Sequence, residues 1–367
     1  MKSNYKRLGD YIRQVDVRNR ELSVTTLLGL SIAKHFIPSI ANIIGTDMSS
    51  YKIVKPRQFG YVPVTSRNGE KITIALYEGT APCIISQAYI VFEVVDSEIL
   101  LPEFLMMWFR RPEFDRYARF KSHGSAREVF EWEEMCEVML PVPPIEEQQK
   151  IVAEYQAVEQ RIENNRRLIA TLEATAQTIY RKMFVNNIDP NNLPQGWRIG
   201  SVTELSNLKV GGDKPNVFSA HKTDECHIPI YANGIINEGK YGYTNCFKIS
   251  SPSFTISSRG TIGACFLRMN PYFPIVRLTS VVPKDKTTIM YQYFYFKNLN
   301  IEGDGSVQSQ LTIPFLSSET IIIPKEALMQ QFNAIALPMY TYISYMKQEQ
   351  LELVGICSLI SSKLSIY

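Results

Sequence analysis

The sequence has few of the signals that mark a disulfide-stabilised, metal-binding or membrane protein. Its six cysteines are scattered and no two form a C-x-x-C pair, so neither a zinc site nor a disulfide framework is expected. No run approaches the roughly 18 uncharged apolar residues of a membrane-spanning helix. Residues Met1 to Arg7 contain no apolar segment of the kind found in signal peptides. We therefore expect a cytoplasmic protein with isolated thiols.

Motifs for catalysis are also missing. There is no G-x-x-x-x-G-K-[ST] loop for nucleotide phosphates and no G-x-G-x-x-G sequence after a predicted strand. The pair Pro143-Pro144 lies between Val142 and Ile145, which differs from the [DNS]-P-P-[YFW] motif of amino-methyltransferases. None of the four histidines has the H-E-x-x-H spacing of a zinc protease. The sequence predicts no catalytic residue, no metal ligand and no cofactor held by this chain, which argues against a standalone enzyme.

An excess of charge of one sign is absent as well. Lys and Arg number 39 against 36 Asp and Glu, which leaves a formal net charge of +3 over 367 residues. This balance excludes a histone-like polycation, so any binding of nucleic acid must come from local basic loops. The length suggests two or three domains, at roughly 100–200 residues each.

The two halves of the chain carry similar short motifs in the same order. Ser66-Arg67 matches Ser258-Arg259 at an offset of 192, and Gly124-Ser125 matches Gly305-Ser306 at an offset of 181. Because the order is kept and a single gap explains the change of offset, the pattern indicates a tandem duplication. The repeats predicted from it are residues 1–185 and 186–367.

Each half begins with short β-like runs broken by Gly, Pro, Asn and Ser, and each ends in a long helical pattern. The predicted fold class is α+β, with two tandem α/β domains separated by two long helices that form an antiparallel coiled coil with a pseudo-two-fold repeat. The predicted bounds are 1–143 and 186–324 for the domains, and 144–185 and 325–367 for the helices.

A seam of apolar residues with alternating steps of four and three follows each helix, as in a left-handed coiled coil. Such a stripe also occurs on ordinary core helices, but at 1.5 Å per residue the first helix is a rod of roughly 58 Å that needs a long partner. The other helix can be that partner if the two pair antiparallel. The predicted seam residues are Ile151, Tyr155, Val158, Ile162, Asn165, Ile169 and Leu172 in the first helix, and Phe332, Met339, Ile343, Met346, Leu353 and Ile360 in the second.

Two kinds of polar loop recur at matched places in the two halves, outside the helices. Arginine reads guanine, Gln and Asn read adenine, and Ser or backbone N–H groups hold phosphates. Each loop alone is also explained as a plain turn, but the recurrence of both favours a two-part surface that recognises DNA. The candidate DNA-binding residues are Arg57, Ser66, Arg67, Asn68, Lys71, Ser122, His123, Ser125, Arg127, Ser258, Arg259, Thr261, Ser306, Gln308, Ser309 and Gln310.

Three further motifs resemble a known family. The first helix begins L-P-V-P-P-I-E-E-Q-Q-K-I at residues 140–151 and ends Y-R-K-M-F at 180–184, and the second half opens L-P-Q-G-W at 193–197. Together with the two alternating domains and helices, these motifs closely resemble the specificity (S) subunit of type I restriction–modification systems. The second helix keeps Gln330-Gln331 but lacks the Glu-Glu pair of the first.

The resemblance implies a division of labour. Each α/β domain would be a target recognition domain that reads one half of a bipartite site in double-stranded DNA, while the helices set the spacing and dock two methyltransferase (M) subunits. Two restriction (R) subunits complete the nuclease, and S-adenosylmethionine, ATP and Mg²⁺ belong to the partner subunits. Two alternatives stay open: a specificity subunit of another multisubunit restriction–modification architecture, and a coiled-coil adaptor with no role on nucleic acid.

Overall fold

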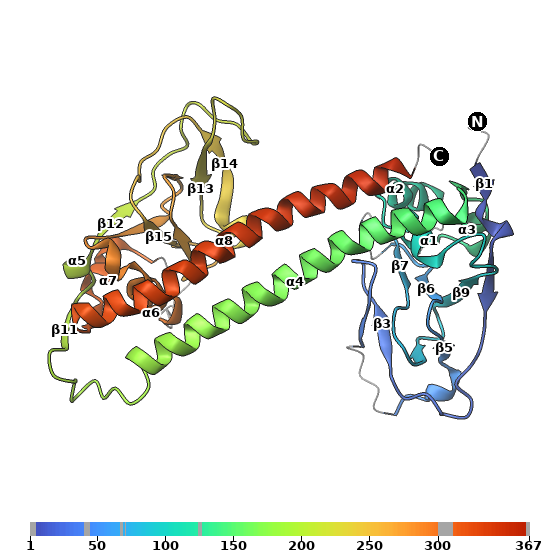
Figure 1. Cartoon of the computed structure of the whole chain (residues 1–367), viewed down its shortest axis with the longest axis horizontal. Helices are drawn as coiled ribbons and strands as arrows, with labels where there is room; N and C mark the ends of the chain where they lie inside the picture. The colour runs from blue at the N-terminus through green and yellow to red at the C-terminus, as the bar shows by residue number, and fades with distance from the viewer. Residues whose placement is uncertain are drawn as a thin grey trace. The chain divides into compact units, whose positions relative to one another are not determined.

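The computed structural model describes residues 5–39, 45–66, 69, 71–123, 127–299 and 311–364. The chain divides into two compact units: unit 1, Met1–Asn165 with Gln348–Tyr367, and unit 2, Arg166–Lys347. Each unit combines a mixed α/β region with one end of each of two long helices (Figure 1). The predicted α+β class, with two tandem α/β regions and two long helices, is confirmed.

The centre of unit 1 is a four-stranded antiparallel sheet with the order β2-β9-β6-β7, accompanied by the pairs β1-β10, β3-β4 and β5-β8. Helices α1 and α2 each begin with a proline at the first helical position, where the missing N–H costs no hydrogen bond. Phe109 of α1 is fully buried and lies edge-on to Phe59 and Phe92 of the sheet. The elements are β1 (Tyr5–Arg7), β2 (Ile12–Val15), β3 (Leu28–Leu30), β4 (Phe36–Pro38), β5 (Lys52–Val54), β6 (Phe59–Val62), β7 (Thr73–Leu76), β8 (Cys83–Ile85), β9 (Ile90–Val94), α1 (Pro102–Phe109), α2 (Pro112–Lys121), α3 (Trp132–Cys136) and β10 (Met139–Pro141).

Unit 2 repeats this plan. Its four-stranded sheet has the order β12-β18-β15-β16, and β11 pairs with β19 as β1 pairs with β10. A three-stranded sheet, β14-β13-β17, is added to it. The elements are β11 (Arg198–Ser201), α5 (Val202–Leu205), β12 (Ser206–Val210), β13 (Ile228–Tyr231), β14 (Lys240–Thr244), β15 (Ser253–Ile256), β16 (Cys265–Arg268), β17 (Phe273–Pro274), β18 (Thr279–Pro283), α6 (Ile289–Asn298), α7 (Ile313–Ser318) and β19 (Thr320–Ile323).

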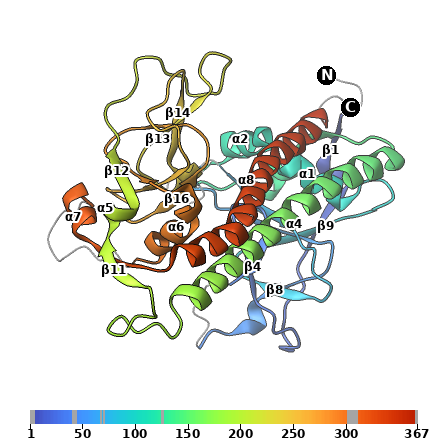
Figure 2. The same ribbon diagram turned by 60° about the vertical axis from the view of Figure 1, so that its left-hand side comes forward.

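The long helices α4 (Ile145–Phe184) and α8 (Glu326–Lys363) lie side by side within each unit (Figures 1 and 2). In unit 1, Arg161 of α4 pairs with Glu349 of α8 at 3.0 Å, and the amide of Asn165 donates to the same carboxylate at 2.6 Å. In unit 2, the ring of Tyr180 packs on that of Phe332. Glu173, earlier on α4, pairs with Lys347, later on α8, at 4.0 Å. Residue numbers thus rise along one helix as they fall along the other, which makes the pairing antiparallel. All the predicted seam residues are buried or half-buried.

A buried amide anchors the start of α4 in unit 1. The side chain of Gln148 is fully buried, and its oxygen accepts from the backbone N–H of Leu101 at 2.9 Å. Its nitrogen donates to the carbonyl oxygens of Ile99 and Pro143, both at 2.8 Å. Because this amide uses its acceptor and both donors, it fixes the first turn of α4 to the chain just before α1. Gln148 belongs to the E-E-Q-Q motif, but no pattern in the sequence indicates these three hydrogen bonds.

The core of unit 2 depends on Phe332, which leads to a stability prediction. This ring is fully buried and lies 5.4 Å from Phe294 and 5.5 Å from Phe184, between ring centroids. Phe332→Ala should lower the free energy of unfolding by about 3–5 kcal/mol, because it leaves a cavity among aromatic rings. Tyr345→Ala on the same helix is the matched control, since Tyr345 is 69% exposed. Urea denaturation of both variants would measure the difference, and equal losses would contradict the packing described.

Candidate nucleic-acid interface

In unit 1 the two kinds of predicted loop lie against each other. The backbone N–H of Thr65 donates to the carbonyl of Glu128 at 2.9 Å, and its hydroxyl donates to that of Ser122 at 3.0 Å. His123 and Val129 exchange both backbone hydrogen bonds, which closes the second loop. Ser66, His123 and Arg127 are exposed at this junction. The structure therefore brings together two loops that the sequence singled out separately.

Beside these loops, unit 1 has a basic cleft of about 630 Å³. Its lining includes the predicted residue Lys71, together with Arg116, Arg119 and the 79% exposed ring of Phe120. Arg119 also donates to the carbonyl of Gly69 in the first loop and pairs with Glu128 in the second. A cleft lined by basic groups next to polar loops is electrostatically suited to a phosphate backbone.

The floor of this cleft is a buried ion pair. Lys34 and Asp115 are 5% and 8% exposed, and Nζ of Lys34 lies 2.7 Å from the carboxylate. Burial lowers the pKa of Lys34, while the hydrogen bond from its ammonium group to Asp115 opposes that shift. Asp115 also accepts from the backbone N–H of Ile72 at 3.1 Å, next to Lys71. This pair therefore holds the chain just after the first predicted loop, and the charges of Lys34 and Asp115 neutralise each other.

Arg57 lies away from the two loops, in the turn before β6, whereas Ser66 follows the other end of that strand. Its guanidinium pairs with Glu103 of α1 at 3.0 Å. Its backbone has a φ of 65°, in the left-handed region. In the structure Arg57 ties a turn to a helix, and no described contact links it to the other candidates.

In unit 2 the predicted loop after β15 has a different role for each of its candidates. Ser258 is 3% exposed, and its hydroxyl shares a hydrogen bond with that of Thr279 at 2.8 Å, so this side chain is occupied inside the unit. Arg259 and Thr261 are half-buried, and Nε of Arg259 and the hydroxyl of Thr261 have no hydrogen-bond partner among the described residues. The carbonyl of Ser258 accepts from the backbone N–H of Leu311 at 3.2 Å, so this loop is also bonded to a second segment of the chain, although here the loop residue accepts, whereas in unit 1 Thr65 donates to Glu128.

The side chain of Asn233 connects its own loop to the loops of Ser258 and Val276, a role that the sequence does not predict. Its side-chain oxygen accepts from the backbone N–H of Ser258 at 2.8 Å, and its nitrogen donates to the carbonyl of Val276 at 2.7 Å. Val276 and Arg277 are exposed, with φ values of 52° and 59°, so this loop is held in a strained conformation. The pair Asn233-Gly234 is a strong turn signal in the sequence, but nothing there indicates what the amide contacts.

Gly211 permits the loop of Arg277 to pack closely on the end of β12. The backbone N–H groups of Val276 and Arg277 donate to the carbonyls of Gly212 and Gly211, at 2.8 and 3.0 Å. A Cβ at Gly211 would lie 2.7 Å from the backbone nitrogen of Ile275, closer than any side chain tolerates. Arg277 thereby joins Arg259 on loops that Asn233 connects, and it adds an exposed arginine beside the half-buried Arg259.

Seven of the candidate residues lie outside the described part of the chain. They are Arg67, Asn68, Ser125, Ser306, Gln308, Ser309 and Gln310.

The residues that the structure describes contain neither a cluster of possible metal ligands nor a helix suited to span a membrane. No three His, Cys, Asp or Glu side chains among them gather where they could hold a metal ion. Burial raises the pKa of the Cys83 thiol to about 11, so this group is protonated at neutral pH and is a poor nucleophile. None of the described helices combines the length and apolar character needed to cross a bilayer.

Two similar α+β units, each with polar loops and with one end of each of the two long helices, define the general class as a duplicated α+β protein. The sequence profile of the type I restriction modification DNA specificity domain matches residues 38–174 and again residues 194–353. Because these matches cover more than half of the chain, the protein belongs to that family. Membership of a specificity family agrees with the prediction that this chain is not itself an enzyme.

Individual relatives are similar over parts of the chain. Two proteins of Mycoplasma pneumoniae named as type I specificity subunits are 29% and 27% identical, over 45% and 56% of this chain. These matches span about half the length of each relative, 49% and 56%. The type I MjaIX specificity subunit of Methanocaldococcus jannaschii is 20% identical over 68% of this chain and 65% of its own.

A crystal structure of the type I S subunit from M. genitalium shares the fold. It superposes with a TM-score of 0.67 at 16% identity, covering 98% of this chain and 95% of that one.

Asn233 provides a prediction that hydrogen exchange can check. In Asn233→Ala the N–H of Ser258 loses the acceptor that protects it, so this amide should exchange at least tenfold faster, as expected when a hydrogen bond of about 1.4 kcal/mol or more is lost. Amides within the β15-β18 ladder should keep their protection, since their partners are backbone groups. Asn216→Ala, an exposed position in the same unit, serves as control. Unchanged exchange at Ser258 would show that Asn233 does not hold this loop.

Proposed function

We propose that the protein is the DNA specificity subunit of a type I restriction–modification complex, in which each unit reads one half of a bipartite target. The observation that carries this proposal is the recurrence of one arrangement in both units. In each, a polar loop that follows a central strand is hydrogen-bonded to a second segment of the chain, through Thr65 and Glu128 in unit 1 and through Ser258 and Leu311 in unit 2. Family membership supports the same reading.

The chemistry of the loops suggests how the two units would share the work of binding. In unit 2, Arg259 is half-buried and its Nε lacks a described partner, so the cost of desolvating this cation is offset if it meets a base edge or a phosphate. In unit 1, the basic cleft with Lys71 and Arg116 would hold the backbone beside the loops. The near-neutral net charge of +3 implies that partner subunits supply part of the phosphate neutralisation.

The helix pair α4 and α8 would set the number of unspecified base pairs between half-sites and dock two M subunits, with R subunits completing the complex. Methylation and cleavage would then occur on those partners, which bind S-adenosylmethionine, ATP and Mg²⁺. The adaptor alternative differs in a measurable way, since it requires no sequence-specific contact with DNA in the assembled complex. The family match favours a type I architecture over other multisubunit ones.

A domain exchange tests the central claim. Replacing residues 1–140 with the equivalent region of another family member should change one half of the methylated motif. The other half and the unspecified spacer should stay the same, because unit 2 and both helices are unaltered. Mapping methylated adenines in cells that express the variant with its M subunit measures both. A change in both half-sites, or in neither, would refute the assignment of one unit to one half-site.

Arg259 gives a second test at the level of a single side chain. Arg259→Ala should weaken binding of the target by the assembled complex by about 1–3 kcal/mol, the value of one specific base contact. Arg259→Lys keeps the charge but loses the bidentate guanidinium, so it should retain binding to random DNA and lose discrimination. Arg198→Ala, an exposed arginine on β11 that pairs with Glu204, controls for the loss of one charge in the same unit. Equal affinity in all these variants would remove Arg259 from the interface.

A further inference from the structure

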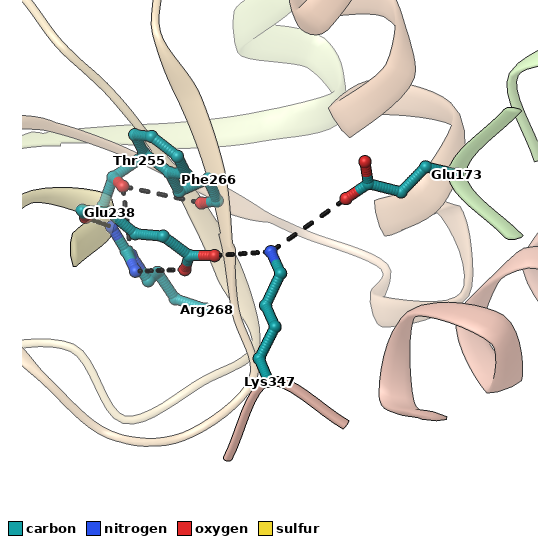
Figure 3. A network of polar contacts seen from close by, with 6 residues as sticks. All are labelled: Glu173, Glu238, Thr255, Phe266, Arg268 and Lys347. Atoms are coloured by element: carbon teal, nitrogen blue, oxygen red, sulfur yellow. Dashed lines mark hydrogen bonds and ion pairs between the residues drawn. The ribbon is translucent and has the colours of Figure 1, made fainter. Parts of the chain in front are cut away.

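A polar network in unit 2 joins the helix pair to a loop of the recognition region (Figure 3). Nζ of Lys347, on α8, lies 2.8 Å from the carboxylate of Glu238 and 4.0 Å from that of Glu173, on α4. Glu238 belongs to the loop 232–239, which connects β13 to β14. Lys347 therefore contacts both the other helix and a loop that is not part of the helical pair.

This loop is held in one conformation by its backbone and by a buried arginine. Asn237, Glu238 and Gly239 have consecutive φ values of 48°, 56° and 76°, and a Cβ at Gly239 would lie 2.4 Å from the carbonyl oxygen of Ala232. Arg268 is 4% exposed and donates to both the carboxylate and the backbone carbonyl of Glu238. The loop therefore has little freedom to absorb a displacement of Glu238 by local bending.

Arg268 is itself held by a hydrogen bond to Thr255, which Figure 3 shows, and by the ring of Tyr231. Its Nε donates to the hydroxyl of Thr255 in β15 at 3.1 Å, and its guanidinium carbon lies 3.5 Å from the ring centroid of Tyr231. Strand β15 leads directly into the loop with Ser258 and Arg259. Arg268, which binds Glu238, is therefore hydrogen-bonded to the strand that carries this loop.

Through Asn233, the loop 232–239 also contacts the two loops that carry Arg259 and Arg277. The Asn233 side chain bonds Ser258 on one side and Val276 on the other, next to Arg259 and Arg277. A continuous series of described contacts thus runs from Lys347 to Glu238, along a conformationally restricted loop to Asn233, and on to both arginine-bearing loops. Physical continuity of this kind can transmit a displacement, provided that each link is stiff.

We propose that Lys347 is a positioning residue that fixes the reading loops of unit 2 against the helix pair, so that base discrimination depends on its ion pair with Glu238. The inference rests on the proposed DNA-reading function and assigns to that site a mechanical connection to the helices. A shift of α8 relative to α4 in this unit carries Lys347 with it. Through the ion pair with Glu238, the loops with Arg259 and Arg277 follow that shift. Lys347 touches no base in this scheme.

Three variants of the assembled complex with its M subunit separate this role from simple structural support. Lys347→Met removes the charge and keeps the length of the side chain, Lys347→Arg keeps the charge, and Glu173→Gln breaks only the contact with the other helix. The readout is the ratio of methylation rates for the target and for targets with one wrong base in either half-site. Lys347→Met should lower discrimination about two- to fivefold in the half-site read by unit 2 only, the range for a partly exposed ion pair. Lys347→Arg and Glu173→Gln should match the parent.

The outcomes distinguish failure of the inference from failure of the proposed function. A parent complex that shows no sequence preference refutes the function and the inference together. A discriminating parent with an unchanged Lys347→Met variant refutes the inference alone, as does an equal loss in both half-sites, which would report general destabilisation. If Lys347→Met does not assemble, hydrogen exchange on the chain itself decides: faster exchange at Ser258 than in Glu173→Gln supports the connection, and equal exchange overturns it.

Discussion

The antiparallel pairing of α4 and α8 is the constraint on which the rest of the structure depends, because each unit is completed by residues from the other half of the sequence. Leu364, which follows the last turn of α8, is fully buried in the core of unit 1. In the same way, Ala176, Tyr180 and Phe184 at the end of α4 enter the core of unit 2. Neither half of the sequence therefore contains a whole hydrophobic core. Contacts of such high sequence separation carry a large loop-closure entropy, so both cores depend on completion of the helix pair.

This arrangement places different chemistry at the two helix starts, although the halves share one plan. In the first half, the amide of Gln148 satisfies three backbone groups at the beginning of α4. At the offset of 181 the second half has Met329, which is 3% exposed and packs in the apolar core of unit 2. A fully bonded amide gives directional fixation, whereas a methionine gives adaptable packing. The missing Glu-Glu pair in the second helix start thus accompanies a change in how that helix is anchored.

The sequence predicts those features that repeat or that have a local period. The seam was visible because spacing by four and three depends only on helix geometry, and residues such as Tyr155, Ile343 and Met346 are buried accordingly. The duplication indicated by matched motifs such as Ser66 and Ser258 predicts that the two units share one plan, and their four-stranded sheets have corresponding orders, but no motif indicates the order itself. By contrast, the partner of Arg57 is Glu103, far along the chain, and no local pattern indicates that pairing. The same limit applies to Asn233, whose turn signal is local while both of its hydrogen-bond partners are distant.

The role of Ser258 illustrates why residue type alone identifies a loop better than it identifies the contacting atom. A serine next to an arginine in a Gly-containing turn fits phosphate binding, yet its hydroxyl is paired with Thr279 and its N–H with Asn233. These bonds stabilise a backbone conformation from which the neighbouring Arg259 projects only half-buried. A loop that must hold a cation in a fixed direction needs such internal bonds, because an arginine free to choose among rotamers would lose that entropy on binding. In the proposed DNA-reading function, the polar residues of this loop would therefore be divided between those that contact DNA and those, such as Ser258, that hold the loop, and only the tertiary structure distinguishes the two.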